Sequence, residues 1–215
     1  MFKKITRTLT AATALASAFA PAFADVWPHA DGMMKHVMVG LENQTIMVHV
    51  EGDPLESLEM LRYPGESYTP PADVLNGMFY NSQYGWMAEG FISLPDGAGV
   101  FVSVLSSDAG LMVYEGGMRS MKHTHTYAPI LGTDGSDPIW LWGGTMVHNW
   151  HAATDPGAYS ATYSVYVGDA ATGAPLDGYT PGQATLYFHA VPAPGALVAL
   201  ALGACLLARR GREVR

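Results

Sequence analysis

The chain has 215 residues, of which 49% are hydrophobic and only 14% are charged, and its formal net charge is −8. The apolar fraction excludes an intrinsically disordered chain, and the length is typical of a single all-β domain. Between residues 25 and 191 only four basic residues stand against eighteen acidic ones. This balance excludes a nucleic-acid-binding surface, because it would repel a phosphate backbone.

The first 24 residues are typical of a secretory signal peptide. A basic start is followed by an apolar, small-residue stretch over 9–20, and Ala22 and Ala24 form an A-x-A cleavage signal. We therefore expect signal peptidase to cleave after Ala24. The mature chain then begins at Asp25, outside the cytoplasmic membrane.

Residues 25–190 consist of short alternating runs broken by Gly, Pro, Asn and Asp, without a long helical period. The expected strands are 34–39, 45–50, 86–94, 100–105, 111–114, 122–127, 139–142, 145–151, 159–167 and 184–191. The stretch 52–83 is less regular: 55–61 is a strand or a helical turn, and 63–73, with three prolines, is a long loop. Short strands at regular spacing predict an all-β fold, a single antiparallel β-sandwich of the Ig-like or jelly-roll-like kind.

Four of the eight histidines form two close pairs that are candidate metal ligands. His123 and His125 are two residues apart, so on the expected strand they share one face. His148 and His151 are three apart and face opposite ways unless a bulge turns one of them. Neutral imidazole is a favoured zinc ligand. These four residues therefore predict a site for zinc or another divalent ion; the alternative is that they are polar residues on an aromatic-rich sheet.

Other chemistry finds little support in the motifs. No nucleophile elbow, HExxH, P-loop or dinucleotide fingerprint is present, so no catalytic residue is predicted. His29 and Asp31 support a weaker hypothesis, a flexible N-terminal arm that loads metal. Carboxylate pairs such as Glu56 and Glu59 are inevitable among eighteen acidic residues, so they do not identify a glycosidase site. Five tryptophans and eleven tyrosines offer a platform for stacking sugars, although such residues commonly form the core of all-β proteins.

Residues 191–215 have the pattern of a sorting tail. Val191, Pro192, Ala193 and Pro194 precede fourteen uncharged residues, and Arg209 and Arg210 follow at once. Fourteen helical residues span about 21 Å, short of a hydrocarbon core of about 30 Å, and the arginines favour retention on the cytoplasmic side. The tail resembles the PEP-CTERM signal that exosortases process in Gram-negative bacteria, with Ala193 in place of the usual Glu. Because Cys205, the one cysteine, lies in this tail, the exported body has no disulfide.

A longer resemblance covers residues 86–191. The run from His148 through Pro156-Gly157-Ala158-Tyr159, with the final aromatic strand, is similar to surface-anchored bacterial β domains, including a PEP-CTERM family regulated by the zinc-uptake repressor. The resemblance implies an anchored, zinc-associated protein rather than an enzyme. His123 and His125 match its pattern; His148 lies one residue out of register, and His151 is this chain's own candidate.

Together these patterns predict a signal peptide (1–24), a β-sandwich domain (25–190) and a sorting tail with a short membrane helix (191–215). We expect a non-catalytic protein of the cell envelope or extracellular matrix that binds zinc, Zn²⁺, through its histidines. Its expected partners are signal peptidase, an exosortase-type enzyme, the membrane through the C-terminal helix, and exopolysaccharide, but no nucleic acid. A carbohydrate-binding surface module is the alternative function, and a metalloenzyme or hydrolase is the third.

Overall fold

A computed structural model describes residues 26–192 of the chain. The predicted signal peptide and the sorting tail beyond Pro192 lie outside the described residues, so both stay predictions. Within 26–192 there is no helix with the length and apolar character needed to cross a membrane.

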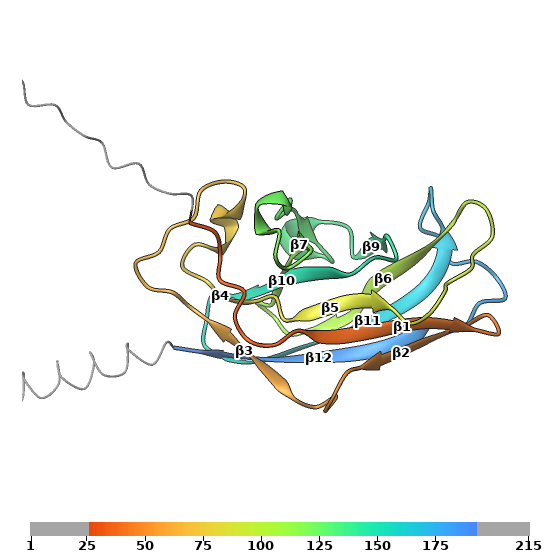
Figure 1. The fold of residues 1–215 in the computed structure, drawn as a ribbon, viewed down its shortest axis with the longest axis horizontal. Helices are drawn as coiled ribbons and strands as arrows, with labels where there is room; N and C mark the ends of the chain where they lie inside the picture. Colours follow the sequence, from red (N-terminus) through yellow and green to blue (C-terminus); the bar gives the residue numbers. More distant parts are fainter. Residues whose placement is uncertain (1–25, 193–215) are drawn as a thin grey trace, which may run out of the picture.

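Strands dominate the described residues, and short 3-10 helices lie between them (Figure 1). The strands are β1 (Lys35–Glu42), β2 (Thr45–Val50), β3 (Ser57–Leu61), β4 (Phe79–Asn81), β5 (Tyr84–Ala88), β6 (Ala98–Ser107), β7 (Met112–Gly117), β8 (Pro129–Ile130), β9 (Ile139–Trp142), β10 (Val147–Ala153), β11 (Gly157–Asp169) and β12 (Gly182–Val191). The helices are η1 (Ala72–Leu75), η2 (Lys122–Thr124) and η3 (Thr133–Gly135).

The strands form one mixed sheet in the order β2-β1-β5-β10-β4-β3-β12-β11-β6-β9, and β7 pairs with both β10 and β8. The all-β prediction is confirmed, but the purely antiparallel arrangement is wrong. Strand β1 runs parallel to β5, and β12 runs parallel to β3. Each parallel pair joins segments far apart in the chain, because a tight turn cannot connect parallel strands.

The sheet curls so that β2 approaches β12 (Figure 1). The Ile46 amide donates to the Thr180 carbonyl at 2.9 Å, and the Thr180 amide donates to the Gln44 carbonyl at 2.8 Å. The main core fills the inner face of this curl. Tyr163 of β11 and Phe188 of β12 are fully buried there. Successive side chains of a strand point to opposite faces of the sheet, and these two residues lie on the face that is turned inward.

A second apolar cluster covers the opposite face of β4 and β10. Trp150 lies at its centre with no exposed surface, and it packs edge-on against Tyr80 at 5.8 Å and stacks on Tyr127 at 5.7 Å. Leu75 of η1 belongs to the same cluster. Because successive residues of a strand point to opposite faces, Trp150 enters this cluster while His151 enters the main core.

The strand expected over residues 122–127 is wrong. Residues 122–124 form η2, in which the Thr124 amide and hydroxyl both donate to the Met121 carbonyl at 2.8 Å. Tyr127 has a φ of 53°, which an extended strand does not adopt. Side-chain bonding to the local backbone has replaced strand pairing here.

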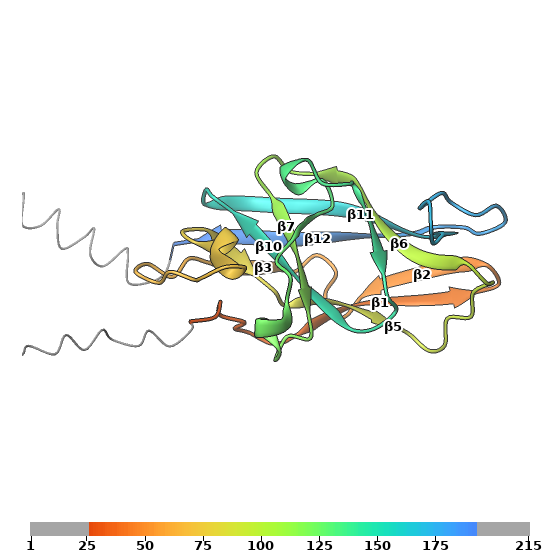
Figure 2. The same ribbon diagram turned by 90° about the horizontal axis from the view of Figure 1, so that it is seen from above.

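The described chain begins and ends at the same end of the domain (Figures 1 and 2). Val191, the last residue of β12, pairs with Leu61 at the end of β3. The N-terminal segment, residues 26–34, lies at this end as well.

Candidate functional site

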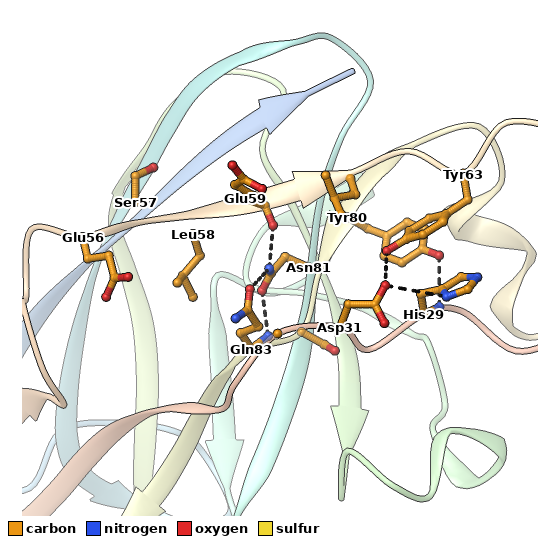
Figure 3. A pocket seen from close by; sticks show the side chains of 13 residues that line it. His29, Asp31, Glu56, Ser57, Leu58, Glu59, Tyr63, Tyr80, Asn81 and Gln83 are labelled. Atoms are coloured by element: carbon orange, nitrogen blue, oxygen red, sulfur yellow. Dashed lines mark hydrogen bonds and ion pairs between the residues drawn. The ribbon is translucent and has the colours of Figure 1, made fainter. Parts of the chain in front are cut away.

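A cleft of about 390 Å³ lies between the N-terminal segment, β3 and the β4–β5 region (Figure 3). Its lining combines aromatic rings (His29, Tyr63, Tyr80), carboxylates (Asp31, Glu56, Glu59) and side-chain amides (Asn81, Gln83). These residues are far apart in sequence, so only the fold brings them together. Concave sites with a few convergent polar groups are where small ligands usually bind.

One wall of the cleft is a series of rings (Figure 3). The imidazole of His29 stacks on Tyr63 with ring centroids 4.0 Å apart and an interplanar angle of 9°. Tyr63 in turn lies 5.5 Å from Tyr80. The Tyr63 hydroxyl donates to Asp31 Oδ2 at 2.6 Å, which fixes a carboxylate beside the stacked pair.

A hydrogen-bonded network behind this wall fixes the rings. The Glu66 carboxylate accepts from the Tyr68 hydroxyl at 2.9 Å and from His29 Nε2 at 3.0 Å, and the Tyr68 and Tyr80 hydroxyls lie 2.5 Å apart. Burial raises the pKa of Tyr63, Tyr68 and Tyr80. Burial also acts to raise the pKa of Glu66, but the hydrogen bonds from His29 and Tyr68 lower it. At neutral pH the phenols therefore stay protonated and Glu66 stays ionised.

The amides form a tightly bonded floor (Figure 3). Asn81 Nδ2 donates to the Glu59 carbonyl and to Gln83 Oε1, both at 2.6 Å, and Gln83 Nε2 donates to the Met33 carbonyl at 2.9 Å. These bonds tie β3 and the β4–β5 turn to the N-terminal segment. The floor is therefore pre-organised.

Carboxylates on the rim give the cleft an acidic character. The side chains of Asp31 and Glu56 are 62% and 57% exposed, and Glu59 is exposed. Lys35 is buried and lies 2.8 Å from Glu56. The rim offers hydrogen-bond acceptors with an excess of negative charge, which disfavours an anionic ligand.

Two of the few cations hold the N-terminal segment in place. Arg119 donates to three consecutive backbone carbonyls, those of residues 30–32, at 2.6 Å to the first and 2.8 Å to the last. Lys122 Nζ donates to the Pro28 carbonyl at 2.7 Å. The N-terminal arm was predicted to be flexible, but the segment is clamped and forms one side of the cleft. Metal loading by His29 and Asp31 stays a prediction.

The first predicted histidine pair is not on one face. His123 is exposed, whereas His125 is only 3% exposed. His125 Nε2 donates to the Met118 carbonyl at 3.0 Å, and its Nδ1 accepts from Trp150 Nε1 at 2.9 Å. Burial lowers the pKa of His125. With both nitrogens engaged, this neutral ring has no lone pair free for a metal ion.

The second pair faces opposite sides of β10, as expected for a regular strand. The His151 ring stacks on Phe188 in the main core at 4.5 Å, and burial lowers its pKa to about 3. His148 is fully buried on the other face, with its Nδ1 3.0 Å from the Ser82 carbonyl, and burial lowers its pKa to about 4. Both rings are neutral at physiological pH.

Within the part of the chain that the structure describes, no group of three or more His, Cys, Asp or Glu side chains is placed to hold a metal ion. His123, His125, His148 and His151 therefore do not form one site there. Zinc binding by the chain stays a prediction.

Sequence reasoning missed the cleft, although it noted some of its residues. The carboxylate pair of Glu56 and Glu59 was visible but not distinctive, and the loop expected over 63–73 contributes Tyr63. No protein-family model matches the chain, and a search of curated proteins finds no match.

Proposed function

We propose that the chain is an exported, non-catalytic binding protein that holds a neutral or amino-bearing sugar residue in the cleft. The observation that carries this proposal is the combination of a stacked aromatic wall, His29 on Tyr63, with exposed carboxylates on the rim. The signal-like first 24 residues and the PEP-CTERM-like tail support export and sorting to the envelope or extracellular matrix.

The chemistry of the wall and rim suits a saccharide. A sugar ring has an apolar C–H face that packs on an aromatic ring, and hydroxyl edges that donate to carboxylates. Asp31 is held beside Tyr63 at 2.6 Å, so both kinds of contact are offered to one ligand. The volume of about 390 Å³ lies within the usual range for small-molecule sites.

The charge of the cleft narrows the ligand class. Asp31, Glu56 and Glu59 stand on the rim, whereas the nearby cations are engaged by the protein itself. Lys35 is buried against Glu56, and Arg119 and Lys122 donate to backbone carbonyls of the N-terminal segment. A polyuronate or sulfated polymer would bring like charges together. A neutral glycan or one carrying amino groups avoids this repulsion, and an ammonium group gains a favourable interaction with the carboxylates.

Calorimetric titration of the full chain in mild detergent tests the proposal. The ligands are a neutral glucan oligosaccharide, a chitosan oligosaccharide and an oligogalacturonate. We expect binding of one of the first two, a loss of about tenfold or more in Tyr63→Ala, and no effect of Phe91→Ala, which removes an aromatic ring that is 89% exposed and outside the cleft. Failure of all three ligands to bind, or tight binding of the oligogalacturonate alone, contradicts it.

A further inference from the structure

A row of alternating histidine and glycine crosses four neighbouring strands. His36 of β1 pairs with Gly85 of β5, Gly85 pairs with His148 of β10, and His148 pairs with Gly117 of β7. Directly paired residues carry their side chains on the same face of a sheet. His36 and His148 therefore face the same way, with a residue between them that has no side chain.

Gly85 is needed for the position of the His148 ring. A Cβ atom on Gly85 would lie 2.5 Å from Cε1 and 2.6 Å from Nε2 of His148, which is closer than real contacts allow. The Cε1–Nε2 edge of the imidazole thus lies over the glycine. The rings of His36 and His148 have centroids 6.2 Å apart and an interplanar angle of 66°.

Each of these histidines has one nitrogen engaged with an acceptor. His36 Nδ1 lies 2.7 Å from Glu51 Oε2, and His148 Nδ1 lies 3.0 Å from the Ser82 carbonyl. The acceptors are a carboxylate oxygen and a backbone carbonyl oxygen, and each takes a hydrogen bond from the ring nitrogen that faces it. Each Nδ1 therefore donates, and in a neutral imidazole this leaves the lone pair on Nε2.

The two Nε2 atoms are buried and, among the described residues, have no hydrogen-bond partner. His148 itself has no exposed surface. Buried nitrogens without a partner are rare in folded proteins. Histidines that bind metals show this same arrangement, with the far nitrogen donating to a carboxylate or carbonyl and the near one directed at the ion.

We propose that His36 and His148 hold one metal ion between their Nε2 atoms, and that this ion is Cu⁺. Two imidazole nitrogens each about 2.0 Å from one ion place their ring centroids about 6 Å apart when the ion lies between them. The observed separation of 6.2 Å fits this arrangement. The proposal does not rest on saccharide binding, although Ser82, whose carbonyl accepts from His148, also lines the cleft. Of the four predicted ligands the site uses only His148.

The ligand set favours a monovalent copper ion over zinc. Imidazole ligands bring no negative charge to the ion, and the positive charge of Arg119 lies near enough to act on His148. A single positive charge is disfavoured less there than a double one. Cu⁺ also accepts two nearly opposed nitrogen ligands, whereas Zn²⁺ requires about four ligands.

Exposed methionines close in sequence to the paired residues support the same ion: Met34 lies two residues before His36, and Met118 follows Gly117, which pairs with His148. Met33 and Met34 follow Gly32, and Met118 and Met121 flank Arg119, whose guanidinium donates to the Gly32 carbonyl at 2.8 Å. The four side chains are 85%, 46%, 45% and 44% exposed, respectively. Thioethers are soft ligands that select Cu⁺, so these side chains offer a surface from which the ion reaches the buried pair.

Competition with a chromophoric Cu⁺ chelator under anaerobic conditions tests the proposal. The full chain carries Cys205→Ser, because a thiolate would otherwise capture Cu⁺. We expect one Cu⁺ per chain and at least tenfold weaker binding in His36→Gln and in His148→Gln. His49→Gln is the matched control, since His49 lies on the neighbouring β2, 3.3 Å from Glu89, and it should leave the affinity unchanged.

One further variant and a second ion separate the buried pair from the surface. Replacement of all four methionines by leucine should keep the one-to-one binding, and Zn²⁺ should bind at least tenfold more weakly than Cu⁺. If His148→Gln does not fold, His36→Gln decides, because His36 is partly exposed and tolerates replacement. Cu⁺ binding that His36→Gln leaves unchanged, binding that disappears with the methionines, or tighter binding of Zn²⁺ overturns the proposal.

Discussion

Arg119→Met is expected to release the N-terminal segment from the domain while the sheet stays folded. The guanidinium donates to three carbonyls of residues 30–32. A hydrogen bond from a charged group contributes about 1.5–3 kcal/mol. Because the three bonds share one partly exposed side chain and such contributions are not additive, we expect a combined loss of about 2–4 kcal/mol in the local stability of the segment.

Hydrogen exchange measured by mass spectrometry checks this loss directly. The His29 amide donates to the Tyr80 hydroxyl at 3.1 Å, and its protection should fall by roughly two orders of magnitude, while β11 and β12 keep theirs. In Arg119→Lys, the protection of the His29 amide should lie between that of the unchanged protein and that of Arg119→Met. One ammonium group cannot donate to three carbonyls at once as the planar guanidinium does. Unchanged exchange at His29 in Arg119→Met would refute the reasoning, and so would equal loss of protection throughout the sheet.

Three other predictions concern the buried rings. Trp150→Phe leaves His125 Nδ1 without its donor and should lower the free energy of unfolding by about 1–3 kcal/mol, which a urea titration measures. His148 and His151 have pKa values of about 4 and about 3 against an ordinary 6.5, so the unfolded chain takes up protons first as the pH falls. Stability should therefore decline as the pH falls from about 6.5 toward 4; urea midpoints should show a weaker decline in His148→Gln, and an identical slope would contradict this. Gly85→Ala places a Cβ 2.5 Å from His148 Cε1 and should cost about 1–3 kcal/mol through overpacking, visible as a lower melting temperature.

Strand prediction succeeded where alternating burial coincides with regular pairing. The expected strand 139–142 coincides with β9, and 184–191 lies within β12, whose buried residues alternate along its length. The strand expected over 86–94 ends at Ala88, because the chain turns at Gly90, which has a φ of 76°. Alternation in sequence does not reveal such a turn, nor the local hydrogen bonds from Thr124 to Met121 that make residues 122–124 a helical turn.

The two sites depend on information that a single sequence does not contain. The cleft needs the N-terminal segment placed against β3, which depends on Arg119 reaching across from the end of β7. The histidine row needs the register that sets His36 and His148 on either side of Gly85. Glycine carries no chemical signal, and His36 alone resembles an ordinary surface residue. Composition indicates that histidines are candidate ligands, but only the order and register of the strands show that His36 and His148 lie together.

The shared location of the two ends of the described chain has a consequence for access to the cleft. Leu61 lines the cleft and pairs with Val191, one residue before the described chain ends. If the tail is held in a membrane, the cleft lies at the end of the domain nearest the bilayer, where long polymers are sterically excluded and the ends of polymer chains are favoured. Proteolytic removal of the tail would then make the cleft accessible. The released form could bind internal residues of a polysaccharide chain, which the tethered form cannot reach.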